Sequence, residues 1–168
     1  MLITGTRTLR NALEDKARRL ADTPFLVFED ASGGTSDRWS WREFDRDVNR
    51  AAHLLLSRGL RHGDKFGLHL GNCPEFLIFW LAAAKTGTVM VPTNPISTAA
   101  EMEYILAHSE SRLAVTEPQY GAAIHAVRGR CPALRDVLEV RPLRPLLRGM
   151  PATPPEVAVA PADEISMQ

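Results

Sequence analysis

Histidine and cysteine are the residue types in this chain that could bind a metal ion or act as nucleophiles, and their spacing favours neither role. The five histidines occur without an H-x-x-x-H or H-E-x-x-H pattern, which is the spacing of zinc ligands on a helix. Cys73 and Cys131 lie far apart and neither has a C-x-x-C partner, so neither a zinc site nor a disulfide framework is indicated. We expect two buried thiols and no metal site.

His69 and a glycine-rich segment are the other candidates for chemistry. His69 alternates with Leu68 and Leu70, which favours a hydrogen-bonded histidine in the core over a catalytic one. Residues 32–36 (Ser-Gly-Gly-Thr-Ser) would cradle phosphate if they joined a strand to the N-terminus of a helix. A second strand candidate follows them instead, so we expect a hairpin loop. No G-x-S-x-G, Walker or G-x-G-x-x-G motif is present, and we assign no catalytic residue.

The elements that would position such residues begin with two helices and a hairpin. Thr8 is a candidate N-cap, and the Ser40/Glu43 pair has the spacing of a capping box before a second helix. Gly59 is suited to end that helix in the left-handed conformation. The predicted elements are a helix over 8–21, strands over 25–29 and 38–41, and a helix over 41–58.

The chain then alternates regularly between apolar strands and helices. Strands are predicted over 66–70, 89–92, 113–116 and 137–140, with starts 23, 24 and 24 residues apart. Helices are predicted between them over 74–86, 98–108 and 118–129, with Pro74 and Pro118 in first turns. Crossovers of this length return the chain parallel to the previous strand. The fold class expected is therefore α/β, a doubly wound and mostly parallel sheet with flanking helices, preceded by a small hairpin.

In such sheets ligands bind beyond the carboxyl ends of the strands. The residues expected there are Gly71, Asn72, Thr93, Asn94, Pro95, Thr116 and Glu117, among which Asn72, Thr93, Asn94 and Thr116 are the candidates for the edge of a cleft. Asn72 and Asn94 also suit a second role, capping turns or helices. Acidic residues do not cluster at these ends, which disfavours a phosphate acceptor of the receiver type.

The helix predicted over 74–86 is apolar on nearly all sides. It should lie buried between the sheet and another layer. If part of that layer is missing from this chain, the exposed surface would favour self-association.

The last part of the chain differs in composition, because six of the twelve prolines fall between Pro142 and Pro161. We expect no helix or strand in that stretch. The sequence thus predicts one α/β unit over 1–140 and a Pro-rich connector over 141–168, with another strand beginning at 163–168.

Overall composition excludes several classes of protein. The 168 residues suffice for one domain, and 20 Lys plus Arg balance 20 Asp plus Glu, which argues against nucleic acid as a partner. The longest apolar run, 76–84, has nine residues, whereas a membrane span needs about 20. The first ten residues do not resemble a secretory signal, so we expect a cytoplasmic protein.

Four segments match known motifs in order and spacing: 39–44 (motif T-Y-x-E-L), 63–68 (G-D-x-V-A-L), 72–76 (N-x-x-E-F) and 84–95 (K-x-G-x-x-x-V-P-x-N-P). Together they resemble the start of the adenylate-forming superfamily, which includes acyl-CoA synthetases, luciferases and the adenylation domains of peptide synthetases. The resemblance covers about residues 8–117 and is most similar to acyl-CoA synthetases of the crotonobetaine/carnitine-CoA ligase type.

The resemblance implies an enzyme that joins a small carboxylic acid to ATP as an acyl-AMP and then transfers the acyl group to a thiol such as CoA, with Mg²⁺ as cofactor. The family's phosphate loop T-S-G-T-T-G-x-P-K, its Y-G-x-T-E and T-G-D segments and its C-terminal lysine domain do not occur in this sequence. The resemblance therefore implies an N-terminal fragment, inactive alone, whose partner is the remainder of the adenylating enzyme.

Two other hypotheses remain open at this point. The chain could be a non-catalytic binding domain or one half of a split adenylating enzyme, which would co-purify with a chain carrying the phosphate loop. It could also be an unrelated flavodoxin-like domain, although no cofactor loop is visible.

Overall fold

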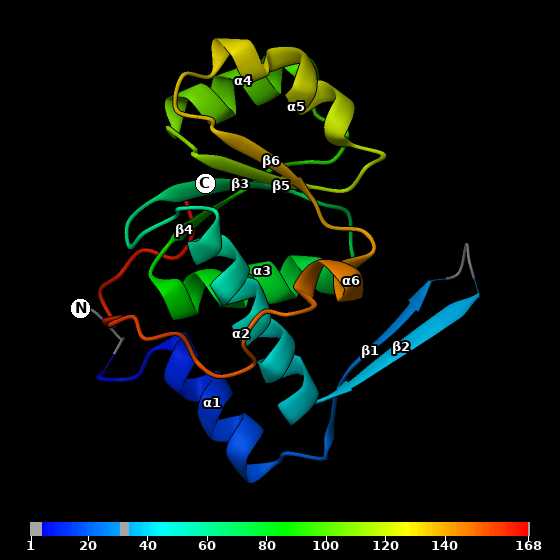
Figure 1. Cartoon of the computed structure of the whole chain (residues 1–168), viewed down its shortest axis with the longest axis vertical. Helices are drawn as coiled ribbons and strands as arrows, with labels where there is room; N and C mark the ends of the chain where they lie inside the picture. Colours follow the sequence, from blue (N-terminus) through cyan, green and yellow to red (C-terminus); the bar gives the residue numbers. More distant parts are fainter. Residues whose placement is uncertain (1–4, 31–33, 168) are drawn as a thin grey trace.

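The computed structural model describes residues 5–30 and 34–167 of the chain. Its centre is a parallel four-stranded sheet in the order β4-β3-β5-β6 (Figure 1). The strands are β3 (Lys65–His69), β4 (Val89–Pro92), β5 (Leu113–Thr116) and β6 (Asp136–Glu139). Because β3 pairs with β4 on one side and β5 on the other, the chain changes winding direction there, and the doubly wound α/β prediction is confirmed.

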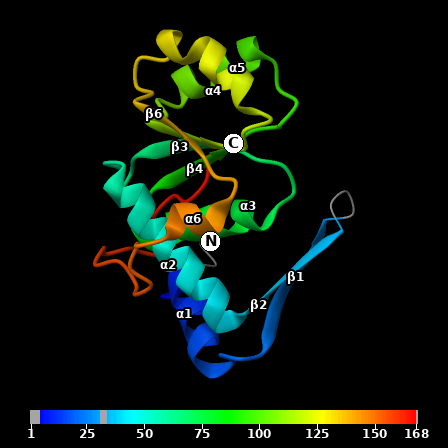
Figure 2. The same ribbon diagram turned by 45° about the vertical axis from the view of Figure 1, so that its right-hand side comes forward.

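Helices cover both faces of this sheet and divide the core in two (Figures 1 and 2). The face toward α2 (Trp41–Ser57) and α3 (Pro74–Thr86) carries the larger apolar cluster, which includes Phe66, Leu68 and Val115. The other face packs against α4 (Ala99–His108) and α5 (Gly121–Val127) through a smaller cluster around Leu106, Ala114 and Ile124. Gly67 keeps the second interface close, since a Cβ there would lie 2.8 Å from Leu106.

The apolar helix α3 is a buried layer of this fold, as its composition predicts. Ile78, Phe79 and Ala82 are fully buried. The helix packs against α2 and against α1 (Leu9–Arg19), and its half-buried Phe76, Leu77, Trp80 and Leu81 lie against the same cluster. The N-terminal helices of this chain thus cover most of α3.

The predicted hairpin is present and projects from the body of the molecule (Figures 1 and 2). It consists of β1 (Pro24–Asp30) and β2 (Thr35–Ser40), paired antiparallel. Trp41, which the predicted strand and the predicted helix share, is the first residue of α2. Residues 31–33 of the predicted loop lie outside the described part of the chain.

Three helices start at a capping box in which the N-cap residue is Ser or Thr. The pairs are Thr8/Asn11, Ser40/Glu43 and Thr98/Glu101. In each pair the hydroxyl accepts from the N3 backbone N–H while the N3 side chain accepts from the cap N–H. Gly59 follows α2 with a φ of 83°, as its predicted role at the helix end requires.

Besides shifts of a few residues at element ends, two features differ from the prediction. Pro118 does not start a helix, because the backbone N–H groups of Tyr120 and Gly121 both donate to Glu117 O and form a turn there. A short helix, α6 (Leu143–Leu147), lies in the Pro-rich stretch that was expected to have none. Pro145 is tolerated at its third position, since the first N–H groups of a helix have no partner within it. Leu143 and Leu147 are buried and draw this turn into the larger cluster.

The remaining connector is an ordered strap that side chains of the body hold by its carbonyl groups. Arg10 donates to Val157 O at 2.7 Å and to Pro155 O at 3.1 Å. Asn49 donates to Ala152 O at 2.9 Å. The strap ends beside β4, where Met90 and Ser166 form a single parallel bridge in place of the longer strand expected there.

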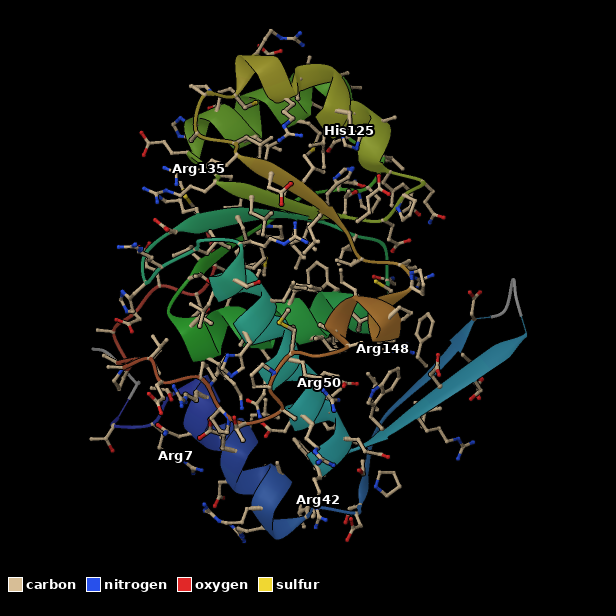
Figure 3. The ribbon with its side chains drawn as sticks, in the orientation of Figure 1. Arg7, Arg42, Arg50, His125, Arg135 and Arg148 are labelled. Carbon is tan, nitrogen blue, oxygen red and sulfur yellow. The ribbon has the colours of Figure 1, made fainter. Side chains whose placement is uncertain are left out.

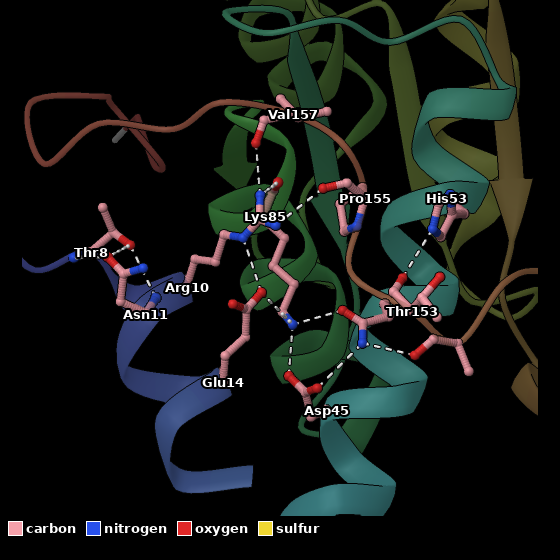
Figure 4. A network of polar contacts seen from close by, with 12 residues as sticks. Thr8, Arg10, Asn11, Glu14, Asp45, His53, Lys85, Thr153, Pro155 and Val157 are labelled. Atoms are coloured by element: carbon pink, nitrogen blue, oxygen red, sulfur yellow. Dashed lines mark hydrogen bonds and ion pairs between the residues drawn. The ribbon is translucent and has the colours of Figure 1, made fainter. Parts of the chain in front are cut away.

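A buried lysine links the three helices beneath the sheet (Figure 4). Lys85 of α3 is fully buried, and its Nζ lies 2.6 Å from Asp45 Oδ1, 2.6 Å from Asn49 Oδ1 and 3.3 Å from Glu14 Oε1. Glu14 also accepts from Arg10 at 2.9 Å. The ammonium group therefore joins α1, α2 and α3, and through Arg10 and Asn49 it is connected to the strap.

Within the described residues, no helix has both the length and the apolar character needed to span a bilayer.

Replacing the buried ammonium should destabilise the fold strongly. Lys85→Met keeps an apolar stem but leaves the Asp45 carboxylate, which is 13% exposed, without its counter-charge. We expect the free energy of unfolding, measured by urea denaturation, to fall by about 3 kcal/mol. The exposed Lys16 is the control, and Lys16→Met should change the free energy of unfolding by less than about 0.5 kcal/mol. Equal effects of the two substitutions would contradict a structural role for Lys85.

The capping box of α4 should make stability depend on pH. The backbone N–H of Thr98, followed by its hydroxyl, lowers the pKa of Glu101 from its ordinary 4.5. A lowered folded-state pKa stabilises the fold above pH 4.5, and that contribution disappears as pH falls through the folded value. Glu101→Gln should therefore be less stable than the parent chain at neutral pH, with a difference that narrows in acid. A difference constant over this pH range would contradict the prediction.

Candidate functional site

The winding direction changes between β3 and β5, so the carboxyl ends of these strands form the edge at which a ligand would bind. His69 at the end of β3 pairs in register with Thr116 at the end of β5. Thr93 follows β4 beside them, and its backbone N–H donates to Leu68 O at 3.1 Å. Adjacent residues of parallel strands in register point to one face, which places these polar side chains in one row.

His69 is the central member of this row and is a core residue, as predicted. It has no exposed surface, and its Nδ1 lies 2.8 Å from Thr93 Oγ1. Its ring meets that of Tyr120 edge to face, with centroids 6.1 Å apart. Burial lowers the pKa of His69, so the ring is neutral at physiological pH. Its Nε2 is buried without a hydrogen-bond partner in the described structure.

Glu117 holds the loop that leaves β3. The residue is 3% exposed, and its Oε1 accepts from the Gly71 N–H at 3.2 Å. Its Oε2 accepts from Gln119 Nε2 at 2.8 Å. Both carboxylate oxygens therefore accept hydrogen bonds, and the carboxylate links the segments that follow β3 and β5.

A second polar contact involves Glu75, in the first turn of α3. Arg141 Nη2 approaches Glu75 Oε2 to 3.6 Å.

Burial, and next the negative charge of Glu75, raise the pKa of Cys73 to about 12. Cys73 is therefore a protonated thiol at neutral pH, which excludes it as an activated nucleophile. Cys131 is also buried, and burial raises its pKa as well, so both cysteines occupy the positions expected of them.

The four predicted cleft residues fall into different environments. Thr93 is half-buried against His69. Thr116 is fully buried, and its hydroxyl donates to Glu117 O at 3.2 Å. Asn72 and Asn94 are exposed, and Asn94 Oδ1 accepts from the Ile96 N–H at 3.1 Å, which is the turn-capping role considered for it.

Tyr120 and Arg141 were not identified from the sequence. Tyr120 was assigned to a helix that begins later, and Arg141 to an extended connector. The only sequence signal for either is its position a few residues beyond the end of a strand.

The side chains at this edge do not fit a metal ion or a nucleotide phosphate. The carboxylate oxygens of Glu117 are taken by N–H donors, and Glu75 faces a guanidinium. Nowhere in the described chain do three or more candidate ligands gather. The residues present therefore do not form a site for Mg²⁺ or for the phosphates of ATP.

Comparison with known proteins identifies the relatives of this fold. The family model described as AMP-binding enzyme matches residues 13–164. The crotonobetaine/carnitine–CoA ligases of Escherichia coli K12 and Shigella flexneri are 40% identical over 120 residues, which is 71% of this chain and 23% of those enzymes.

Solved structures agree at the level of the fold. A fatty acyl CoA synthetase of Mycobacterium tuberculosis superposes with a TM-score of 0.84 at 25% identity, covering 95% of this chain and 32% of that one. The N-terminal domain of FACL13 from the same organism gives a TM-score of 0.85 at 24% identity, over 95% of this chain and 41% of that domain.

The chain spans about a quarter of the length of the curated relatives it matches, and the part it matches is the N-terminal part of AMP-forming acyl-CoA synthetases. The expected resemblance is thus confirmed, and this chain belongs to the family of AMP-binding enzymes.

Proposed function

We propose that this chain forms one wall of the acyl and nucleotide cleft of an ATP-dependent acyl-CoA synthetase. The observation that supports this most is the 40% identity to CoA ligases over a segment that includes the whole of β3, α3 and β4. In this proposal residues 1–140 are the subdomain that carries the sheet, and residues 141–168 are the connector to the second subdomain.

The cleft would be bounded by the carboxyl ends of the sheet. Asn72 and Asn94 are exposed there and are available to touch a ligand or the facing subdomain. Thr93 and Thr116 would act from behind, by fixing His69 and the end of β5.

The chemistry itself would be supplied by the remainder of the enzyme. That partner would bring the groups that hold ATP, Mg²⁺ and CoA, and a small carboxylic acid would be the acyl substrate. We further propose that the complete enzyme is cytoplasmic. Self-association of the isolated chain was expected from an uncovered α3, and because α1 and α2 cover most of that helix we do not propose it through α3.

The isolated 168-residue chain should be inactive, because the residues at its carboxyl edge do not form a phosphate or Mg²⁺ site. We expect no carboxylate-dependent exchange of pyrophosphate into ATP above a blank without protein. The full-length Escherichia coli ligase, assayed in parallel, is the positive control. Exchange by the chain alone would contradict the proposal.

A chimera should test whether the chain is an equivalent structural part of such an enzyme. The 120 matched residues would replace their counterparts in the Escherichia coli K12 ligase. If the sheet edge forms the same wall, we expect CoA thioester formation within about a factor of 100 of the parent rate, since imperfect positioning costs about that much. A chimera with the parent's unfolding midpoint but no thioester formation would contradict the proposal.

A further inference from the structure

A basic groove lies away from the carboxyl edge of the sheet, between α2, β2 and the turn that follows α6. Its volume is about 510 Å³, within the range of small-molecule sites. Arg46 and Arg50 reach it from α2, Arg38 from β2, and Arg148 from the end of α6. Figure 3 shows Arg50 and Arg148 on the same face of the molecule.

Positive charge in this groove exceeds negative charge. Two carboxylates, Glu43 and Asp47, line it together with the four arginines. Asp47 accepts from Arg50 Nη1 at 2.9 Å, so one of the four arginines forms an ion pair inside the groove. Counted over its described lining residues, the groove therefore has a surplus of two positive charges in a chain whose formal net charge is zero.

Both carboxylates of the groove also accept hydrogen bonds from uncharged groups of the protein, which fix their positions. Asp47 Oδ2 accepts from the Trp39 indole N–H at 3.1 Å. Glu43 Oε2 accepts from the backbone N–H and the hydroxyl of Ser40, at 2.9 and 2.8 Å, as the cap of α2.

The floor of the groove is apolar. Trp39 and Leu147 are buried, and Met150 is half-buried against the same cluster. Gly149 makes the turn between them with a φ of 85°, a conformation that disfavours other residues. The site thus pairs guanidinium donors with an apolar surface.

We propose that this groove binds a small phosphorylated molecule with a doubly charged phosphate group and a compact apolar part. Guanidinium forks suit the planar, bidentate recognition of phosphate oxygens, and two surplus positive charges match a phosphate dianion. The proposal does not depend on the proposed function, because none of the groove residues belongs to the carboxyl edge.

Phenyl phosphate is the probe, titrated into the isotope-labelled 168-residue chain and followed by NMR. We expect saturable shifts of the Trp39 indole N–H and the Gly149 amide at millimolar ligand. The variant Arg38→Gln/Arg148→Gln should bind about tenfold more weakly or worse, because two charge-assisted contacts are lost. Both arginines are exposed, and circular dichroism checks that the variant remains folded.

The matched control is Arg42→Gln/Arg135→Gln, which removes the same charge from exposed positions outside the groove. Its affinity should equal that of the parent chain. Equal weakening in both variants would show diffuse attraction and overturn the proposal, as would the absence of saturable shifts. A phosphate dianion can also come from a lipid headgroup, so vesicles of phosphatidylglycerol with phosphatidic acid form a second arm. Binding to vesicles without binding to phenyl phosphate would also overturn the proposal.

Discussion

The burial of one ammonium group constrains the arrangement of everything below the sheet. A lysine without exposed surface must have counter-charges and acceptors within reach, because an isolated buried charge is very costly. Lys85 obtains them from two helices, through Glu14 on α1 and Asp45 with Asn49 on α2. The ammonium group of α3 therefore obtains its partners only when α1 and α2 are both in place. Asn49, together with Arg10, also holds the strap that returns to the edge of β4.

The Lys85 network and the carboxyl edge of the sheet are two different parts of the molecule. The polar network and the strap lie under α3, whereas the carboxyl ends of β3, β4 and β5 are stiffened by internal bonds such as Glu117 to Gly71. At this edge the histidine is buried and neutral and the cysteine is protonated. Under the proposed function, such a preorganised edge would position ligands while another part of the enzyme carries out the chemistry.

The net charge of the whole chain does not describe the charge of a local part of its surface. The formal net charge is zero, from which we expect no general nucleic-acid footprint. Locally, however, Arg38, Arg46 and Arg148 face one groove, together with Arg50 and two carboxylates. These residues come from β2, from α2 and from the end of α6, and only the packing of α6 on the core brings them together.

The sequence alone determined the local structure and the family. Hydrophobic periodicity, the Ser40/Glu43 and Thr98/Glu101 capping boxes and the regular strand spacing predicted nearly every helix and strand, because these signals act between residues a few positions apart. Tertiary structure decided the rest. The α6 turn forms because Leu143 and Leu147 find a core to enter, despite the prolines around them. Lys85 and Asp45 are 40 residues apart, and Gly71 and Glu117 are 46 apart. No local pattern specifies such pairs, since their partners meet only when the crossovers bring distant segments together.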